Sequence, residues 1–177
     1  MSLGNNALKE VIDELDHKYD ILAVLSHNMS RQIEYIKSID VYNSEYYIMS
    51  LCHKLMEEIT NYLKIRKPDF IIYAIELAAK SLSGHDCQNC SGNHAPQHAD
   101  HIFKLQESYG KTSGALQKIY KAFPSSSFHN LYSDAYVVLR NQVTTIERTL
   151  IDIFFVEEIY LKPKIVSAQN NMNLPNH

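Results

Sequence analysis

Residues 128–161 read FHNLYSDAYVVLRNQVTTIERTLIDIFFVEEIYL, and apolar residues recur along this stretch at steps of three and four. On an α-helix such steps place one apolar side chain per turn on the same face. That face comprises Tyr132, Ala135, Leu139, Val143, Ile146, Leu150 and Ile153. The stretch therefore predicts a long amphipathic helix, and we expect Pro163 to stop it because proline lacks a backbone N–H.

The same spacing predicts four further helices, at residues 6–39, 44–65, 68–82 and 96–123. Only 5 Gly and 5 Pro interrupt the chain, which favours long helices over many short strands. We expect an all-α fold, an antiparallel four-helix-type bundle in which one helix is kinked at Pro68. Residues 1–166 are expected to form a single domain, followed by a polar, flexible tail at 167–177.

Composition and charge exclude several functional classes. Hydrophobic residues make up 45% of the chain, too many for a disordered protein. The net charge is −3 and the basic residues are scattered, so we expect no nucleic-acid partner. No apolar run approaches the roughly 20 residues of a membrane span, and residues 1–6 do not resemble a secretory signal. We therefore expect no membrane partner and a cytoplasmic location.

A loop between the third and fourth predicted helices, residues 84–96, reads GHDCQNCSGNHAP and is rich in metal-ligand residue types. With the start of the next helix it gathers two cysteines and four histidines within 17 residues, from a chain with 3 Cys and 9 His: His85, Cys87, Cys90, His94, His98 and His101. Thiolate and imidazole are the ligands that Zn²⁺ prefers, and a C-x2-C turn lets both sulfurs reach one ion. The loop predicts a metal site, with zinc favoured over iron. The alternative is a solvated polar loop that binds nothing.

Glu157, which lies outside this loop, is a further predicted ligand. It falls at the centre of the apolar face of the helix at 128–161, and glutamate is rarely buried without a partner. A hairpin at Ser125 would bring Glu157 near His98, which lies on the apolar face of the helix at 96–123. The predicted ligand set is therefore Cys87, Cys90, His94, His98, His101 and Glu157. Fraying of the helix end is the alternative explanation for Glu157.

The predicted helix at residues 44–65 contains two other candidate ligands and the third cysteine. His53 and Glu57 have a ligand spacing, H-x3-E, but lie nearly opposite the apolar face, which favours a solvated position. Cys52 lies on the apolar face and is expected to be a buried structural thiol. An odd number of cysteines also argues against a disulfide framework.

Two short segments, His53-Lys-Leu-Met-Glu57-Glu58 and Val156-Glu-Glu-Ile-Tyr-Leu-Lys-Pro163, resemble the hemerythrin-like family of cation-binding bundles, with His98 or His101 opening a helix. The resemblance implies a four-helix bundle whose histidines and H-x3-E residues bind two irons and handle O₂ or nitric oxide. Ile153 stands where that pattern has a histidine, and the Cys-x2-Cys loop is additional to it.

These patterns lead to one principal hypothesis, a metal-binding helical bundle with a regulatory or sensory role. Its thiolates would make it responsive to metal or to oxidants. A di-iron protein that handles O₂ or nitric oxide is one alternative. A helical scaffold or interaction module without metal is another, and a protein partner or a homodimer is compatible with each.

Overall fold

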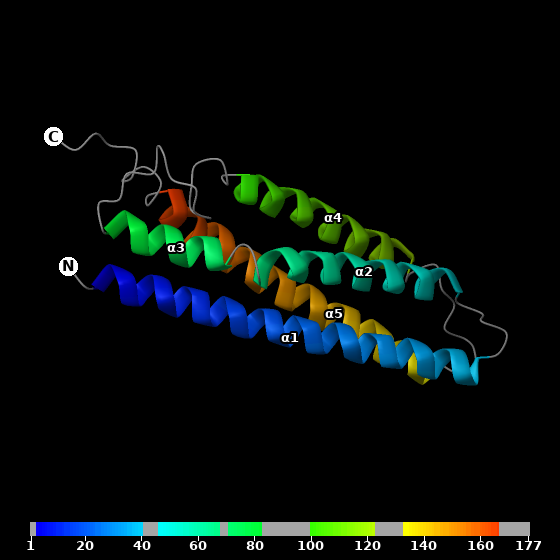
Figure 1. Ribbon diagram of the computed structural model, residues 1–177. Coiled ribbons are helices and arrows are strands. Elements are labelled where there is room, and N and C mark those ends of the chain that lie inside the picture. Colours follow the sequence, from blue (N-terminus) through cyan, green and yellow to red (C-terminus); the bar gives the residue numbers. More distant parts are fainter. Residues whose placement is uncertain (1–2, 41–45, 68–70, 83–99, 123–132, 167–177) are drawn as a thin grey trace. The chain divides into compact units, whose positions relative to one another are not determined.

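The computed structural model describes residues 3–40, 46–67, 71–82, 100–122 and 133–166. Apart from Asp40, these residues are helical, and none of them lies in a β-strand, which confirms the all-α prediction. The described residues form the α-helices labelled in Figure 1, which are α1 (Leu3–Ile39), α2 (Tyr46–Ile65), α3 (Ile71–Leu82), α4 (Asp100–Ala122) and α5 (Ser133–Val156). A π-helical segment, η4 (Glu157–Leu161), continues α5, and α-helical residues follow to position 166.

The predicted helices overlap the observed ones. The helix expected at 6–39 begins slightly earlier, at Leu3, and α2 ends at Ile65 as predicted. The predicted kink at Pro68, the loop at 84–96 and the tail at 167–177 lie outside the described residues. They therefore stay predictions.

The expected helix stop at Pro163 is wrong, because residues 162–166 are α-helical. Immediately before Pro163 the chain forms the wide η4 turn, in which the backbone N–H of Lys162 donates to the carbonyl oxygen of Glu157, five residues back. A proline ring in a regular helix clashes with the carbonyl four residues earlier. The wider turn moves that carbonyl aside, so the helix continues through the proline.

The chain divides into two compact units that interleave along the sequence. Unit 1 comprises Met1–Tyr19, Lys64–Glu107 and Asp152–His177, and unit 2 comprises Asp20–Leu63 and Ser108–Ile151. The division falls inside α1, α2, α4 and α5, so each of these helices contributes to both units. The single domain expected at residues 1–166 remains a prediction.

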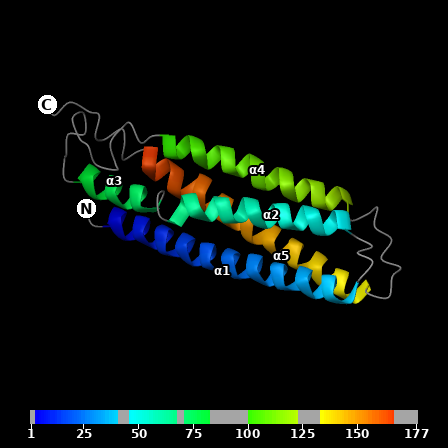
Figure 2. The same cartoon turned by 45° about the vertical axis from the view of Figure 1, so that its right-hand side comes forward.

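Unit 2 is built from parts of four helices. Figures 1 and 2 trace its α1 and α4 segments in one direction and its α2 and α5 segments in the opposite direction. Each helix buries one apolar stripe whose members recur mostly at steps of three, four or seven residues, as the sequence predicted: Leu22, Met29, Ile33 and Ile36; Ile48, Cys52, Leu55, Ile59 and Tyr62; Ala115, Leu116 and Ile119; Leu139, Val143, Ile146 and Leu150. Burial of these side chains is the main stabilising contribution in this unit.

Unit 1 draws its core from other segments of the same chain. Figures 1 and 2 both draw α3 beside the first turns of α1. Its buried apolar residues come from α1, from α3, and from the end of α5 with η4 and the helical residues that follow: Ile12, Leu15 and Tyr19; Ile71, Tyr73 and Ala74; Ile153, Val156, Leu161 and Ile165. Two charged side chains, Arg66 and Glu157, are buried with them.

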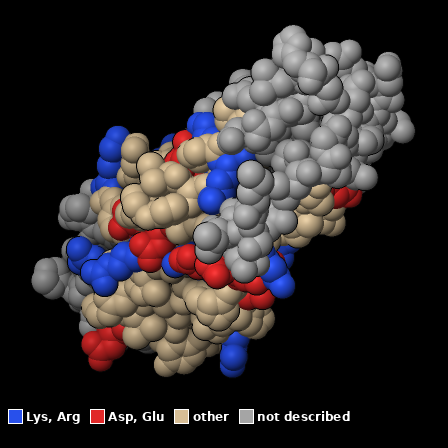
Figure 3. All heavy atoms as spheres, turned by 90° about the vertical axis from the view of Figure 1, so that its left-hand side faces the viewer, with Lys and Arg blue, Asp and Glu red and all other residues tan. Residues whose placement is uncertain are grey.

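The helix surfaces are mixed in character. On the face shown in Figure 3, basic and acidic side chains are interspersed. Several apolar side chains are also more than half exposed, among them Val24, Tyr35 and Tyr46. Within the described ranges, no helix is both long enough and apolar enough to cross a bilayer.

Candidate functional site

Of the six predicted metal ligands, the structure describes the side chain of Glu157 alone. Cys87, Cys90, His94 and His98 precede the described part of α4, and so does His85. His101 lies in the first turn of α4, but its side chain is not among those described. The structure therefore neither assembles nor separates the predicted Cys/His ligands.

Glu157 is the first residue of η4, and its side chain is completely buried. Two donors from distant parts of unit 1 meet at its Oε1 atom. The Tyr19 hydroxyl donates to Oε1 at 2.5 Å, and Arg66 Nε donates to the same oxygen at 3.1 Å. Tyr19 and Arg66 are also fully buried. We call this group the Tyr19–Arg66–Glu157 network.

The network places an ion pair in an apolar interior. Moving a carboxylate and a guanidinium out of water costs several kcal/mol per ion, and only close pairing and further hydrogen bonds offset this. Arg66 balances the charge of Glu157, and Tyr19 supplies an additional hydrogen bond. Nearer the surface, Lys67 Nζ lies 3.3 Å from Asp16 Oδ1, but both side chains are more than a third exposed. This outer pair contributes about 1 kcal/mol at most.

Both charged members of the network are π-helical residues: Arg66 directly follows α2, and Glu157 opens η4. A π-turn contains one extra residue and occurs frequently at functional sites. In a regular α-helix each step of four residues rotates the side chain by about 40° away from its starting face. The extra residue in η4 compensates for this rotation. Leu161 and Ile165, four and eight residues after Glu157, therefore face the core and are buried.

Sequence analysis found Glu157 but missed its two partners. Burial of Glu157 confirms that it belongs to the apolar face of its helix, and fraying of the helix end is not observed. Arg66 follows Tyr62 by four residues and continues the buried stripe of α2, while Tyr19 stands between Leu15 and Leu22 on the buried stripe of α1. That periodicity was a usable signal for both residues.

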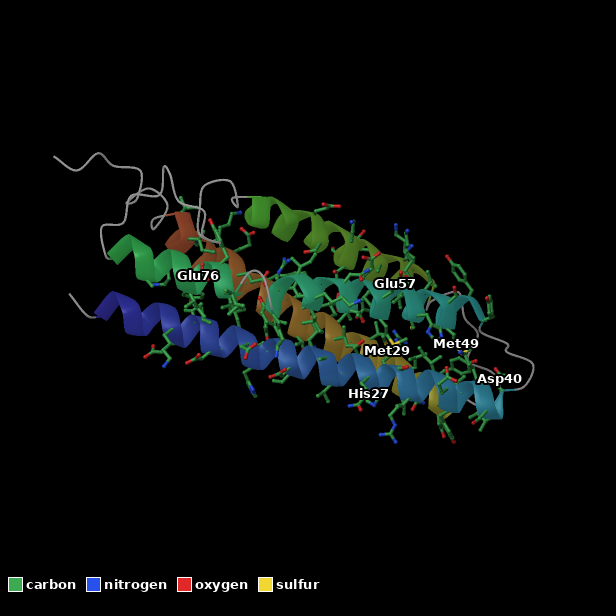
Figure 4. The ribbon with its side chains drawn as sticks, in the orientation of Figure 1. His27, Met29, Asp40, Met49, Glu57 and Glu76 are labelled. Carbon is green, nitrogen blue, oxygen red and sulfur yellow. The ribbon has the colours of Figure 1, made fainter. Side chains whose placement is uncertain are left out.

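A second buried carboxylate, that of Asp40, directly follows the end of α1 in unit 2. Asp40, labelled in Figure 4, accepts a hydrogen bond from the Tyr136 hydroxyl at 2.9 Å. Its backbone N–H donates to the carbonyl oxygen of Ile36. These contacts tie the last turn of α1 to α5, which is a structural role.

The H-x3-E residues of α2, His53 and Glu57, are both exposed, as their position opposite the apolar stripe predicted. Figure 4 shows Glu57 on α2. His53 is close enough to Glu34 of α1 to help lower the pKa of that carboxyl, after the larger effects of a hydrogen bond and charge attraction from Lys37. Among the described residues, no three His, Cys, Asp or Glu side chains gather in a group suited to a metal ion.

Cys52 is the buried thiol that the sequence predicted, with no exposed surface. Burial raises its pKa from 9.0 to about 12, and the thiolate is the reactive form. In a Cys87→Ser/Cys90→Ser background, we expect Cys52 to react with a disulfide reagent at pH 8 at least about tenfold more slowly in the native chain than in urea, because burial both lowers the thiolate fraction and shields the sulfur from the reagent. Similar rates in native and unfolded chains would contradict its burial.

We compared the chain with protein-family models, curated proteins and solved structures, and none of them matches. The hemerythrin-like resemblance therefore remains a prediction from short motifs. Over the residues that it describes, the structure defines an all-α protein with a buried Tyr19–Arg66–Glu157 network.

Proposed function

We propose that the protein is a metal-binding helical protein with a regulatory or sensory role, and that zinc rather than iron is its metal. The observation that carries the proposal is the concentration of thiol and imidazole groups at residues 85–101. The described segments on either side, α3 and residues 100–107 of α4, belong to unit 1, as does Glu157. A four-helix-type bundle kinked at Pro68 is part of the same proposal.

The ligands we propose are Cys87, Cys90, His94, His98 and His101, from which a tetrahedral ion would take four. Glu157, which the sequence pattern added to this set, has a different role in the proposal. Its Oε1 already accepts hydrogen bonds from Tyr19 and Arg66. A divalent cation bound to Glu157 would lie close to the guanidinium charge of Arg66 and be repelled by it. We therefore propose Glu157 as a buried anchor of unit 1 and not as a ligand.

A sensory role follows from the chemistry of the two thiolates. An oxidant such as hydrogen peroxide takes two electrons from Cys87 and Cys90, forms a disulfide between them and is reduced to water. A disulfide no longer supplies two thiolate ligands, so the zinc is released. Buried Cys52, with its raised pKa, would stay reduced under the same conditions.

Metal content tests the proposal. The native chain, loaded with zinc and desalted, is expected to retain about one zinc per chain by elemental mass spectrometry, and Cys87→Ser/Cys90→Ser is expected to lose it. Glu157→Gln is expected to keep the metal. His53→Gln/Glu57→Gln, which removes exposed ligand-type residues elsewhere, is the matched control and should also keep it.

Two outcomes would overturn this proposal. Full metal content in the cysteine variant would exclude the loop as the ligand source. A native chain that holds neither zinc nor iron would favour a helical scaffold without metal. Circular dichroism of each variant separates loss of a ligand from loss of the fold.

A further inference from the structure

The boundary between the two compact units falls inside helices. It follows Tyr19 in α1, Leu63 in α2, Glu107 in α4 and Ile151 in α5. Unit 2 contains a segment of each of these four helices, and each segment buries apolar side chains. Unit 2 therefore has an apolar core of its own, which does not depend on the residues of unit 1.

Buried polar groups lie close to this boundary in three places along the chain. Tyr19 is the last residue of the α1 segment of unit 1, and its hydroxyl donates to Glu157. Arg66 is the third residue of the segment that begins at Lys64, and it is π-helical. Glu157 is the sixth residue of the segment that begins at Asp152, and it opens η4. A buried ion pair and two departures from regular α-helix thus occur next to the boundary.

The remaining helix, α4, has glycines near the same boundary. Gly110 is the third residue of the unit 2 segment that begins at Ser108, and Gly114 follows one turn later. A Cβ atom at either position would meet nothing within 4 Å, so close packing does not require glycine there. Glycine inside a helix is less stable than alanine because it loses more backbone freedom on folding. The glycines therefore weaken α4 near its boundary.

The buried ion pair resists opening less than apolar side chains of the same size would. Arg66 and Glu157 regain their hydration when unit 1 opens, whereas apolar side chains become exposed to water at a cost. Proteins open in contiguous cooperative segments whose opening free energies can lie well below that of global unfolding. We propose that unit 1 opens in this way while unit 2 stays folded, and that zinc bound at residues 85–101 holds unit 1 closed. The zinc part rests on the proposed function.

Zinc would regulate the opening by mass action. The described segments that flank the proposed ligands, α3 and residues 100–107 of α4, belong to unit 1. A ligand that binds only the closed form raises the ratio of closed to open molecules by a factor of about one plus the ratio of the ligand concentration to Kd. Oxidation of Cys87 and Cys90, which releases the zinc, would then restore the opening.

Native-state hydrogen exchange of the metal-free full chain, measured by mass spectrometry at low urea concentrations, tests the opening. Amides of residues 9–19 and 152–166 are expected to share one opening free energy and one urea dependence. They should also exchange at least about tenfold faster than amides of residues 22–36 and 139–150. Fraying of helix ends would instead give graded rates without urea dependence. Such graded rates, or one opening free energy for all four ranges, would overturn the proposal.

Two variants test whether the units open separately. Tyr136→Phe removes the hydrogen bond to Asp40 in unit 2, a bond that stays intact when only unit 1 opens. It is expected to speed exchange in residues 139–150 about tenfold and to leave residues 152–166 unchanged. Glu157→Ala, in unit 1, is expected to speed exchange in residues 152–166 about a hundredfold. Equal acceleration of both ranges by Tyr136→Phe would show a single cooperative unit and overturn the proposal.

A comparison of the zinc-loaded and metal-free chains tests the regulation. Zinc is expected to slow exchange in residues 152–166 at least about tenfold, and to have no such effect on Cys87→Ser/Cys90→Ser. A chain that retains zinc but exchanges at the metal-free rate would overturn the regulatory link. A chain that holds no metal would overturn the proposed function, whereas exchange of the metal-free chain would still decide whether unit 1 opens.

Discussion

Glu157→Ala is expected to lower the free energy of unfolding by about 3–5 kcal/mol, the usual cost of removing one partner of a buried ion pair. The substitution leaves the Arg66 guanidinium enclosed in unit 1 without the carboxylate that balances its charge. It also removes the acceptor of the Tyr19 hydroxyl. Urea unfolding followed by far-ultraviolet circular dichroism measures the change.

Glu158→Ala is the matched control for this prediction. Glu158 is the next residue, and its carboxylate lies 2.8 Å from Lys162 Nζ in a partly exposed pair. Such a pair contributes about 0–1 kcal/mol. A cost for Glu157→Ala no greater than that for Glu158→Ala would contradict the buried network.

A double replacement distinguishes the effect of an unpaired charge from the effect of lost side-chain packing. Arg66→Met/Glu157→Leu substitutes apolar side chains for both ions, and replacing a whole buried pair is often neutral or stabilising. We expect it to regain most of the stability that Glu157→Ala loses. If the double variant is as unstable as the single one, packing rather than an unpaired charge explains the loss.

Deletion of Thr145 is expected to unfold the protein, whereas deletion of Ile159 is expected to be tolerated. Thr145 is exposed in the middle of α5, and its loss rotates every later residue of the helix by about 100°. Leu150 and Ile153 then leave the core, and each buried side chain of this size contributes about 1.5–3 kcal/mol. With Ile146 displaced as well, the loss is comparable with the whole stability of an ordinary domain, about 5–15 kcal/mol.

Ile159 lies in η4 and is 55% exposed. Its removal takes out the extra residue of the π-turn, so the segment can close as a regular α-helix. Leu161 and Ile165 would then follow Glu157 by three and seven residues, which is ordinary core spacing. Thermal unfolding of the two deletion variants compares them directly. A chain that tolerates loss of Thr145 but unfolds without Ile159 would contradict the role assigned to η4.

The helices were predictable from the sequence because their apolar stripes repeat at every turn. Leu139, Val143 and Ile146 are buried as their spacing predicted, and so is Cys52. The candidate site was only partly predictable. Glu157 was identified as a buried acid in need of a partner, but the partners were not. The proposed function rests on the predicted Cys/His ligands, and these were predicted from composition and spacing alone.

The sequence by itself determined where the helices run and which face of each is buried, because helix periodicity is a local property of the chain. Only the tertiary structure decided that the carboxylate of Glu157 meets Arg66, 91 residues away, and Tyr19, 138 residues away. It also decided that the chain widens into a π-turn at Glu157 and remains helical beyond Pro163. The pairing of buried polar groups depends on how separate helices pack and on single-residue insertions. Neither leaves a periodic signal in the chain.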